Sequence, residues 1–319
     1  MAKAHQPRCG SMQFWHRKRA KRIYARVRAH LNGEAKPGAF AGYKVGMTHL
    51  IVIDNRGKSD TKGEEIFCPA TIIECPPLKS VSLRFYKKTT SGLHLISEVS
   101  TPNVDKELGR KISIPKKTSK KIEDFTDFDE LRIQVYTQPK LTGIGKKKPE
   151  VFEMTLGGKK EDALKWAREN LGKEFTIKDV FKEGQQLDIH AITKGQGFQG
   201  PVKRFGVALR RHKSEKTKRG PGSLGPWRGQ LHVMPRVAHA GQTGFHQRTE
   251  YNKVLLKIGE KDELKPTAGF HKYGFLKNNY ILIRGSVAGP KKRLIILTQA
   301  QRPSHLIPTE APAIRYIQK

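Results

Sequence analysis

The sequence predicts a mainly β fold, either a barrel or a sandwich, with α-helical insertions and extended basic segments. Short runs rich in β-branched and aromatic residues recur along the chain, with glycine and proline between them. The chain contains 30 Gly and 18 Pro, so many of its residues belong to turns and loops. Closely spaced short strands favour this architecture over a doubly wound parallel sheet.

The predicted strands fall in two groups, five between residues 48 and 193 and two near the C-terminus. The last two are separated by Ala288-Gly289-Pro290, so we expect them to be antiparallel neighbours joined by a turn. The runs with strand character are residues 48–54, 67–74, 81–86, 131–137, 187–193, 280–287 and 294–298.

One clear helix is predicted over residues 161–171, acidic at its start and followed by Gly172. Trp166 on this helix is expected to belong to the core. A second, short helix is predicted to begin at Thr176, because Thr176 and Asp179 have the spacing of a capping box. The polar residues 100–129 carry no clear pattern.

The charge balance of the chain selects its class of partner. Lys and Arg number 62 against 29 Asp and Glu, a formal net charge of +33 with a pI near 10.2. So large an excess of positive charge is compatible with compact folding only beside a polyanion, and nucleic acid is the obvious candidate. Binding through counterion release would weaken steeply as salt is raised.

Other classes of protein are disfavoured by the sequence. No apolar run approaches the roughly 18 to 20 residues that span a bilayer, and the polar, basic N-terminus does not resemble a signal peptide. Cys9, Cys68 and Cys75 are odd in number and lack paired C-x-x-C spacing, so neither a disulfide framework nor a zinc knuckle is expected. A reducing, cytoplasmic location fits.

The N-terminal residues 7–28 form a basic arm without an acidic residue. Phe14, Trp15 and Tyr24 lie among its cations, which indicates ordering against a surface on which aromatic rings can stack. A disordered solubilising tail or a localisation signal is the plainer alternative. Seven cations of the arm are predicted to contact RNA: Arg17, Lys18, Arg19, Lys21, Arg22, Arg26 and Arg28.

Positive charge is concentrated again in residues 194–249, where Glu215 is the single acid. Glycine and proline crowd this stretch, so it should form neither long helices nor regular strands. We interpret it as a finger inserted into RNA. Its glycines let backbone amides approach phosphates closely, and its cations neutralise those phosphates. Trp227, Phe245 and the histidines offer flat surfaces on which unstacked bases can lie. A flexible linker is the alternative.

Three possible chemical sites in this finger are weaker interpretations. Gly195–Gly200 has the form G-x-G-x-x-G, but Pro201 and a basic run follow it instead of a helix, so a tight turn facing phosphates is favoured over dinucleotide binding. His232, His239 and His246 recur evenly without a second cluster of ligands, which disfavours a metal site. A hydrolase needs a nucleophile, a base and an orienting acid, and this segment has a single carboxylate and no cysteine. Neither an enzyme nor a cofactor is therefore predicted.

Several motifs together resemble the universal large-subunit ribosomal protein L-three family, over nearly the whole chain. Residues 42–48 are similar to the start of the family's first barrel strand, residues 240–244 to the return of its finger, and residues 285–293 to its closing hairpin. The insertion at residues 156–181 resembles the archaeal and eukaryotic branch, and an archaeal-type member is favoured. The family signature is matched at Phe181, Asp188, Ala191, Thr193, Gly195, Gly197, Gly200 and Arg204.

The resemblance implies a mainly β fold with α insertions: a six-stranded translation-protein-type β-barrel with a basic N-terminal arm and a long central RNA-penetrating finger. The implied segments are 1–41 (arm), 42–194 (first part of the barrel with its helical insertion), 195–250 (finger), 251–300 (remaining barrel strands) and 301–319 (tail). Gln196 departs from the family, which has a basic residue there, and the path between Lys218 and Trp227 is shorter.

The function implied is that of a structural constituent of the large (50S) ribosomal subunit. Such a protein binds near the 3′ end of 23S rRNA, nucleates assembly, reaches toward the peptidyl transferase centre and contacts ribosomal proteins L-fourteen and L-twenty-four. Trp227 matches the tryptophan of the finger tip. An RNA-modifying enzyme and an architectural nucleic-acid-binding protein are the alternatives. Beyond the seven arm cations, the predicted RNA-binding residues are Lys194, Lys203, Arg204, Arg210, Arg211, Lys213, Lys216, Lys218, Arg219, Trp227, Arg228, His232, Arg236, His239, Gln242, His246 and Arg248.

Overall fold

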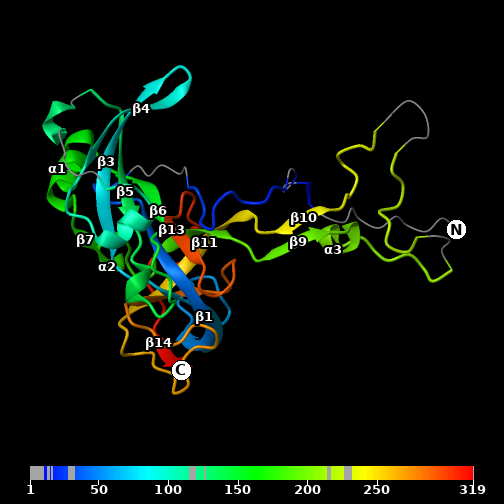
Figure 1. Ribbon diagram of the computed structural model, residues 1–319. Coiled ribbons are helices and arrows are strands. Elements are labelled where there is room, and N and C mark those ends of the chain that lie inside the picture. The colour runs from blue at the N-terminus through cyan, green and yellow to red at the C-terminus, as the bar shows by residue number, and fades with distance from the viewer. Residues whose placement is uncertain are drawn as a thin grey trace. The chain divides into compact units, whose positions relative to one another are not determined.

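The computed structural model describes residues 11–12, 15, 17–27, 33–114, 120–125, 127–213, 217–225 and 232–318. The chain divides into two compact units. The first, here called the ribbon unit, consists of Met1–Arg22 and Ile192–Gln247; the second, the sheet unit, consists of Ile23–Ala191 and Arg248–Lys319. Strands dominate the described residues, so the prediction of a mainly β fold is confirmed (Figure 1).

The larger sheet of the sheet unit brings together strands from both ends of the chain. Its order is β13-β8-β11-β12-β2-β1-β14, and β13 also pairs with β1. Hydrogen-bonded neighbours therefore form a closed circuit of six strands, with β14 alongside β1. The strands are β1 (Ala39–Ile53), β2 (Glu65–Glu74), β8 (Gln186–Ile192), β11 (Gln247–Gly259), β12 (Tyr280–Arg284), β13 (Leu294–Gln299) and β14 (Ile314–Ile317).

Strand β1 closes this circuit because its length lets it serve two partners along one edge. Its first residues pair with β13, from Ala39 opposite Thr298 to Tyr43 opposite Leu294. Its later residues, beginning with Leu50, pair with β14, while β2 runs along the other edge. A register shift between Lys44 and Gly46 separates a short first part of the β1–β2 ladder from the longer remainder.

A second sheet of five strands has the order β4-β3-β5-β6, with β7 paired to β3. Its strands are β3 (Leu78–Thr89), β4 (Gly92–Ser100), β5 (Glu130–Tyr136), β6 (Val151–Thr155) and β7 (Glu174–Phe175). The polar residues 100–129 include two short 3₁₀ helices, η2 (Lys106–Arg110) and η3 (Ile122–Asp124), and a third, η4 (Pro139–Leu141), follows β5.

The two predicted helices of the insertion are present. Helix α1 (Lys160–Asn170) buries Ala163 and Ala167, and Trp166 packs partly buried against the core, with its ring edge-on to Phe175 at a centroid separation of 6.3 Å. Helix α2 (Ile177–Val180) begins after Thr176, whose backbone N–H donates to the Asp179 carboxylate at 2.6 Å. The predicted capping box is therefore confirmed.

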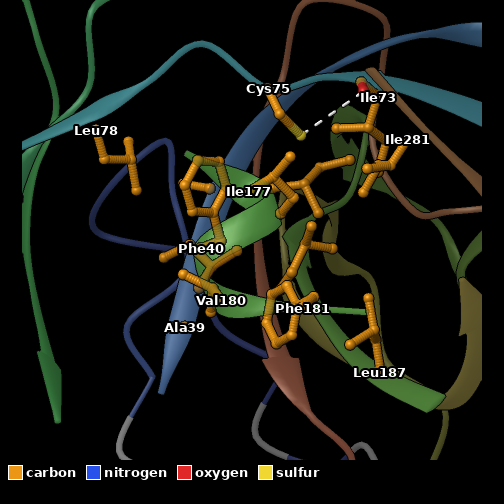
Figure 2. Packing of buried hydrophobic residues seen from close by; sticks show 14 of the residues in the cluster. Ala39, Phe40, Ile73, Cys75, Leu78, Ile177, Val180, Phe181, Leu187 and Ile281 are labelled. Carbon is orange, nitrogen blue, oxygen red and sulfur yellow. Dashed lines mark hydrogen bonds between the residues drawn. The ribbon is translucent and has the colours of Figure 1, made fainter. Parts of the chain in front are cut away.

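A single large cluster of buried apolar side chains joins the sheets and α2. Figure 2 shows Phe40 of β1 close to Ile177 and Val180 of α2, and the Cys75 thiol directed at the Ile73 carbonyl 3.7 Å away. Cys68 and Cys75 are buried free thiols. Burial raises the pKa of the Cys75 thiol, so this side chain behaves as an apolar core residue.

The predicted pairing of the last two strands is wrong. Strand β12 pairs with β11 and β2, whereas β13 pairs with β8 and β1, so both edges of each strand are taken by other partners. The connection between them folds onto β1 instead: Lys44 Nζ donates to the Val287 carbonyl and to the Gly289 carbonyl at 3.2 Å, and the Lys292 amide donates to the Lys44 carbonyl at 2.7 Å. The connection at residues 285–293 is therefore not a hairpin.

Within the ribbon unit, a two-stranded ribbon is formed by β9 (Gly195–Gln199) and β10 (Gly241–Gly244), and helix α3 (Pro201–Phe205) follows β9 directly (Figure 1). The interpretation of Gly195–Gly200 as a tight turn without a following helix is therefore wrong. Pro201 fits the first helical turn, and Gly206 ends the helix with φ +70°. The expectation of no regular strand also fails here, because the two ends of the loop pair with each other.

No helix in the described part of the chain is long and apolar enough to cross a membrane.

Candidate nucleic-acid interface

The basic N-terminal arm is hydrogen-bonded to the residues around the ribbon. The Ala20 amide donates to the Phe245 carbonyl at 2.8 Å, and Nδ1 of His246 donates to the Lys18 carbonyl at 2.7 Å. In Figure 1 the arm, coloured blue, runs beside β10. These backbone contacts give residues 17–20 a defined path, so their side chains project from fixed positions.

His246 connects three segments of the ribbon unit. Its amide donates to the Thr193 hydroxyl at 3.1 Å, and its carbonyl accepts the Thr193 amide at 3.0 Å. The side chain is buried, with 6% of its surface exposed. Since its Nδ1 is committed to Lys18, His246 supports the arm from within, whereas the sequence predicted it as an RNA contact.

Arg204 of α3 is held against β10 by its guanidinium group. Its Nε donates to the Gln242 carbonyl at 3.1 Å, and its Nη1 donates to the His239 carbonyl at 2.8 Å. Gly241 allows this approach, because a Cβ there would lie 3.0 Å from the guanidinium carbon. Burial, and then the charge of Arg17, lower the pKa of Arg204. This cation therefore joins α3 to the ribbon.

A small cluster of aromatic rings and cations takes the place of an aliphatic core in this unit. The guanidinium carbons of Arg17 and Arg204 lie 4.5 and 5.0 Å from the centroid of the buried Phe205 ring, and the Trp15 ring lies 6.3 Å from it. Arg17 Nη1 also donates to the Arg204 carbonyl at 3.0 Å. Cation–π contacts of this kind stabilise by about 0.5 to 2 kcal/mol each.

The turn that closes β10 depends on a glycine. Gly244 has φ +69°, and a Cβ at this position would lie 2.0 Å from the Lys194 carbonyl oxygen. The next residue, Phe245, donates its amide to that carbonyl at 3.0 Å. The Gln242 side chain reinforces the turn, since its Nε2 donates to the Gly244 carbonyl at 3.0 Å. This amide is directed inward rather than toward a ligand.

The other predicted cations and histidines of the ribbon unit are exposed. They do not gather in a pocket but are spread along the arm, the ribbon and the loop beyond α3, where the Arg210 amide donates to the Lys218 carbonyl at 3.0 Å. The exposed residues are Lys18, Arg19, Lys21, Arg22, Lys194, Lys203, Arg210, Arg211, Lys213, Lys218, Arg219, His232, Arg236 and His239.

The remaining predicted residues are placed elsewhere. Arg26 and Arg248 belong to the sheet unit, where Arg26 is exposed and Arg248 is half-buried. Arg28, Lys216, Trp227 and Arg228 lie outside the described residues, as does Phe14.

The described residues of the ribbon unit include fourteen Lys and Arg and no Asp or Glu. No ion pair can therefore form among these described residues, and like charges accumulate on this unit. Single exposed cations attract small anions weakly, but a surface with so many of them has the electrostatic character that a polyanion requires. This unit is therefore the candidate nucleic-acid interface of the chain.

Comparison with known proteins identifies the family of the chain. The family model described as Ribosomal protein L3 matches residues 1–131 and 128–317. The chain belongs to the ribosomal protein L3 family. The resemblance inferred from the sequence motifs is therefore confirmed.

Archaeal L3 relatives match the chain over nearly its full length. The protein named large ribosomal subunit protein uL3 of Methanosphaera stadtmanae is 49% identical, and the match covers 99% of this chain and 98% of the relative. The protein of the same name from Archaeoglobus fulgidus is 47% identical over 94% of this chain and 93% of the relative. That from Methanocaldococcus jannaschii is 44% identical over 98% and 96%.

Two phenylalanines of this L3 family member were missed by the sequence reasoning. Phe205 is the buried centre of the aromatic and cationic cluster, and Phe198 on β9 is 78% exposed. Phe198 could have been noticed from its setting alone, because it is the one apolar residue in a strand of glycine and glutamine. The three evenly spaced histidines do not converge: no group of three potential metal ligands occurs in the part of the chain that the structure describes.

Proposed function

We propose that this L3 family member is a structural constituent of the large ribosomal subunit, in the cytoplasmic ribosome, that binds 23S rRNA through its ribbon unit and carries out no catalysis. The observation that carries the proposal is the acid-free surface of the described ribbon unit, with its fourteen cations. The relatives are named as proteins of the large ribosomal subunit, which supports the same role.

The cations of the ribbon unit have two roles in this proposal. Arg17 and Arg204 hold the arm and α3 in place through carbonyl and ring contacts. The exposed cations, such as Lys194 and Lys203, neutralise phosphates and release counterions. Because Arg17 and Arg204 order the backbone in advance, less conformational entropy is lost when RNA binds.

The finer features of the proposal follow the family. The circuit β1-β2-β12-β11-β8-β13 would be the translation-protein-type barrel, and residues 195–250 the finger that reaches toward the peptidyl transferase centre. The arm at 1–41, the barrel parts at 42–194 and 251–300 and the tail at 301–319 complete the division. We place the binding site near the 3′ end of 23S rRNA, with a role in nucleating assembly and contacts to ribosomal proteins L-fourteen and L-twenty-four.

The electrostatic basis of this function is tested by salt. The purified chain should bind fragments from the 3′ region of 23S rRNA, with the logarithm of affinity falling linearly with the logarithm of salt concentration. Loss of about a thousandfold in affinity between 50 and 200 mM salt corresponds to about six phosphate contacts. Equal binding at both concentrations, or failure to copurify with large subunits through a high-salt wash, would contradict the proposal.

The finger is tested by removing its distal part, residues 220–233. Because the deleted residues lie outside the strand circuit, the shortened chain should remain soluble and keep its sheet unit. Large subunits assembled with it should form peptide bonds more slowly than those with the full chain. Normal peptide-bond formation by such subunits would reject a finger that supports the catalytic RNA.

A further inference from the structure

The Phe198 side chain is exposed without any visible structural reason. Its exposed fraction of 78% is the largest among the large apolar side chains of the described residues, while Phe205, seven residues later, is 9% exposed. A phenyl ring held in water forgoes the roughly 2 to 3 kcal/mol that its burial would contribute. A ring that contributes nothing to the core of its own unit is available to a partner.

The backbone that carries this ring is well defined. Phe198 stands opposite Gln242 in the ladder between β9 and β10, and the Gln199 side chain donates to the Gln196 carbonyl at 2.9 Å. The strand pairing therefore fixes the direction in which the ring points before any partner arrives. An aromatic ring has only two side-chain torsions to order, so its immobilisation on binding costs little entropy.

The neighbours of the ring leave open space around it. A Cβ at Gly197 or Gly200 would meet no atom within 4 Å, so no side chain overlies the strand at these positions. A flat group could approach the ring, and the bare backbone beside it, without displacing any part of the described chain. Larger residues at these two positions would narrow this access.

The surrounding charge decides what kind of partner fits. Lys194 and Lys203, which precede and follow β9 in the sequence, are exposed, and the described ribbon unit contains no carboxylate. A protein partner would need carboxylates beside its apolar surface to match these positive charges. A nucleic-acid strand presents flat apolar bases and negatively charged phosphates together. Bases become available for stacking only where they are unpaired.

We infer that Phe198 is a stacking site for an unpaired base of RNA, flanked by phosphate contacts at Lys194 and Lys203. The inference rests on the proposed function and adds a ligand class to it: single-stranded or looped RNA at β9, in place of regular duplex. Stacking on an aromatic ring tolerates any base, so this site adds affinity for unpaired RNA without selecting a sequence.

The experiment compares variants of the full chain on two defined probes, a single-stranded oligoadenylate of about twelve nucleotides and an RNA duplex of the same length. Phe198→Ala and Phe198→Leu should each lower affinity for oligoadenylate by about tenfold, whereas Phe198→Trp should retain it. Affinity for the duplex and the salt dependence of binding should not change, because no phosphate contact is lost. Leu209→Ala, at another exposed apolar residue of the ribbon unit (62%), should behave like the unchanged chain.

The outcomes separate the inference from the function on which it rests. If the unchanged chain binds neither probe in a salt-dependent manner, the proposed function fails. If it does bind, but Phe198→Ala matches it on oligoadenylate, the stacking site is rejected while the function stands. A Phe198→Ala defect confined to capture of another ribosomal protein would also overturn it, in favour of a protein partner. Unchanged thermal unfolding of the variants, expected for so exposed a residue, confirms that binding alone was altered.

Discussion

The two units of this chain use their positive charges in opposite ways. In the sheet unit, cations meet carboxylates: Arg56 pairs with Asp54 at 2.7 Å, and Arg84 with Glu98 at 3.0 Å and also with Glu153. In the ribbon unit, Arg17 and Arg204 meet backbone carbonyls and an aromatic ring. The first arrangement neutralises charge within the fold, and the second uses cations to order the backbone of a unit whose described residues contain no carboxylate.

The difference extends to what stabilises each unit. The sheet unit buries a large cluster of aliphatic and aromatic side chains. The described ribbon unit has few buried side chains, among them Phe205 and His246, and depends on hydrogen bonds between the arm, β9 and β10. Segments with few apolar contacts open locally at lower free energy, so the ribbon unit should be the less stable of the two. The four predictions below test this contrast.

The largest effect is expected from Glu74→Ala in the sheet unit. Glu74 is fully buried, and its Oε1 accepts the amides of Lys277 and Asn278 at 2.9 and 3.0 Å and the Asn278 side chain at 2.8 Å. Burial, and then the charge of Glu74, hold the pKa of Tyr273 well above its usual range, so the Tyr273 hydroxyl stays protonated and donates to this carboxylate.

Removing the Glu74 acceptor leaves buried donors without a partner, so the free energy of unfolding should fall by about 3 kcal/mol in chemical denaturation. Glu65→Ala, on the same strand but exposed, should change it by less than about 0.5 kcal/mol. A loss below about 1 kcal/mol for Glu74→Ala would show that the sheet unit does not depend on this buried carboxylate.

In the ribbon unit, Gly244→Ala should have the next largest effect. Its φ of +69° and the overlap of a Cβ with the Lys194 carbonyl together should cost about 2 kcal/mol of local stability. Hydrogen exchange of the Phe245 and Ala20 amides should then accelerate by at least about tenfold. Gly200→Ala is the matched control, because its φ is −72° and a Cβ there meets nothing within 4 Å. Equal exchange in the two variants would contradict this prediction.

Arg204→Lys and Lys203→Gln should separate the two roles of cations within the ribbon unit. A lysine at position 204 cannot reproduce the forked donation to Gln242 and His239, so local stability should fall by about 1 kcal/mol with little change in the salt dependence of RNA binding. Lys203→Gln should lower the slope of log affinity against log salt by up to about 0.9 and leave stability unchanged. Equal changes in stability and in salt dependence for the two variants would contradict the division into structural and phosphate-binding cations.

The smallest expected effect is the pH dependence contributed by His190 in the sheet unit. Its ring nitrogens lie 3.0 Å from the Thr249 hydroxyl and 3.1 Å from the Thr298 hydroxyl. Burial lowers the pKa of His190, against an opposing contribution from Asp188. Below the ordinary histidine pKa, His190 therefore binds a proton more readily in the unfolded chain than in the folded chain. The free energy of unfolding falls as pH decreases from about 7.5 to 5.

Urea denaturation across this pH range measures the contribution of His190. His190→Gln should flatten the decline, whereas His239→Gln, at an exposed histidine of the ribbon unit, should leave it as it is. Parallel curves for His190→Gln and the unchanged chain would show that the buried imidazole makes no such contribution.

Local patterns in the sequence were sufficient wherever neighbouring residues decide the structure. The capping box at Thr176 and the helix near residues 161–171 depend on contacts a few positions apart, and both are present. Helix α3 has equally local signals in Pro201 and Gly206, but they were outweighed by the richness of the segment in glycine. Its omission was an error of interpretation rather than a limit of the sequence.

Contacts between distant residues could not be read in the same way. The closing hairpin predicted between residues 280 and 298 fails because β12 and β13 find better partners in strands far away in the chain. The different roles of Arg204 and Lys203 also depend on distant residues. The two cations are adjacent in the sequence, but the Arg204 guanidinium contacts the β10 backbone and the Lys203 side chain is exposed to solvent.

By itself, the sequence determined the excess of positive charge, its concentration in the arm and in residues 194–249, the mainly β character and the family. These properties follow from composition and from motifs a few residues long, and folding does not alter them. The tertiary structure decided which strands are neighbours, which cations support the fold and which face solvent, and that Phe198 stands uncovered. Those outcomes depend on competition among distant segments for the same hydrogen bonds and the same buried space, which no local pattern records.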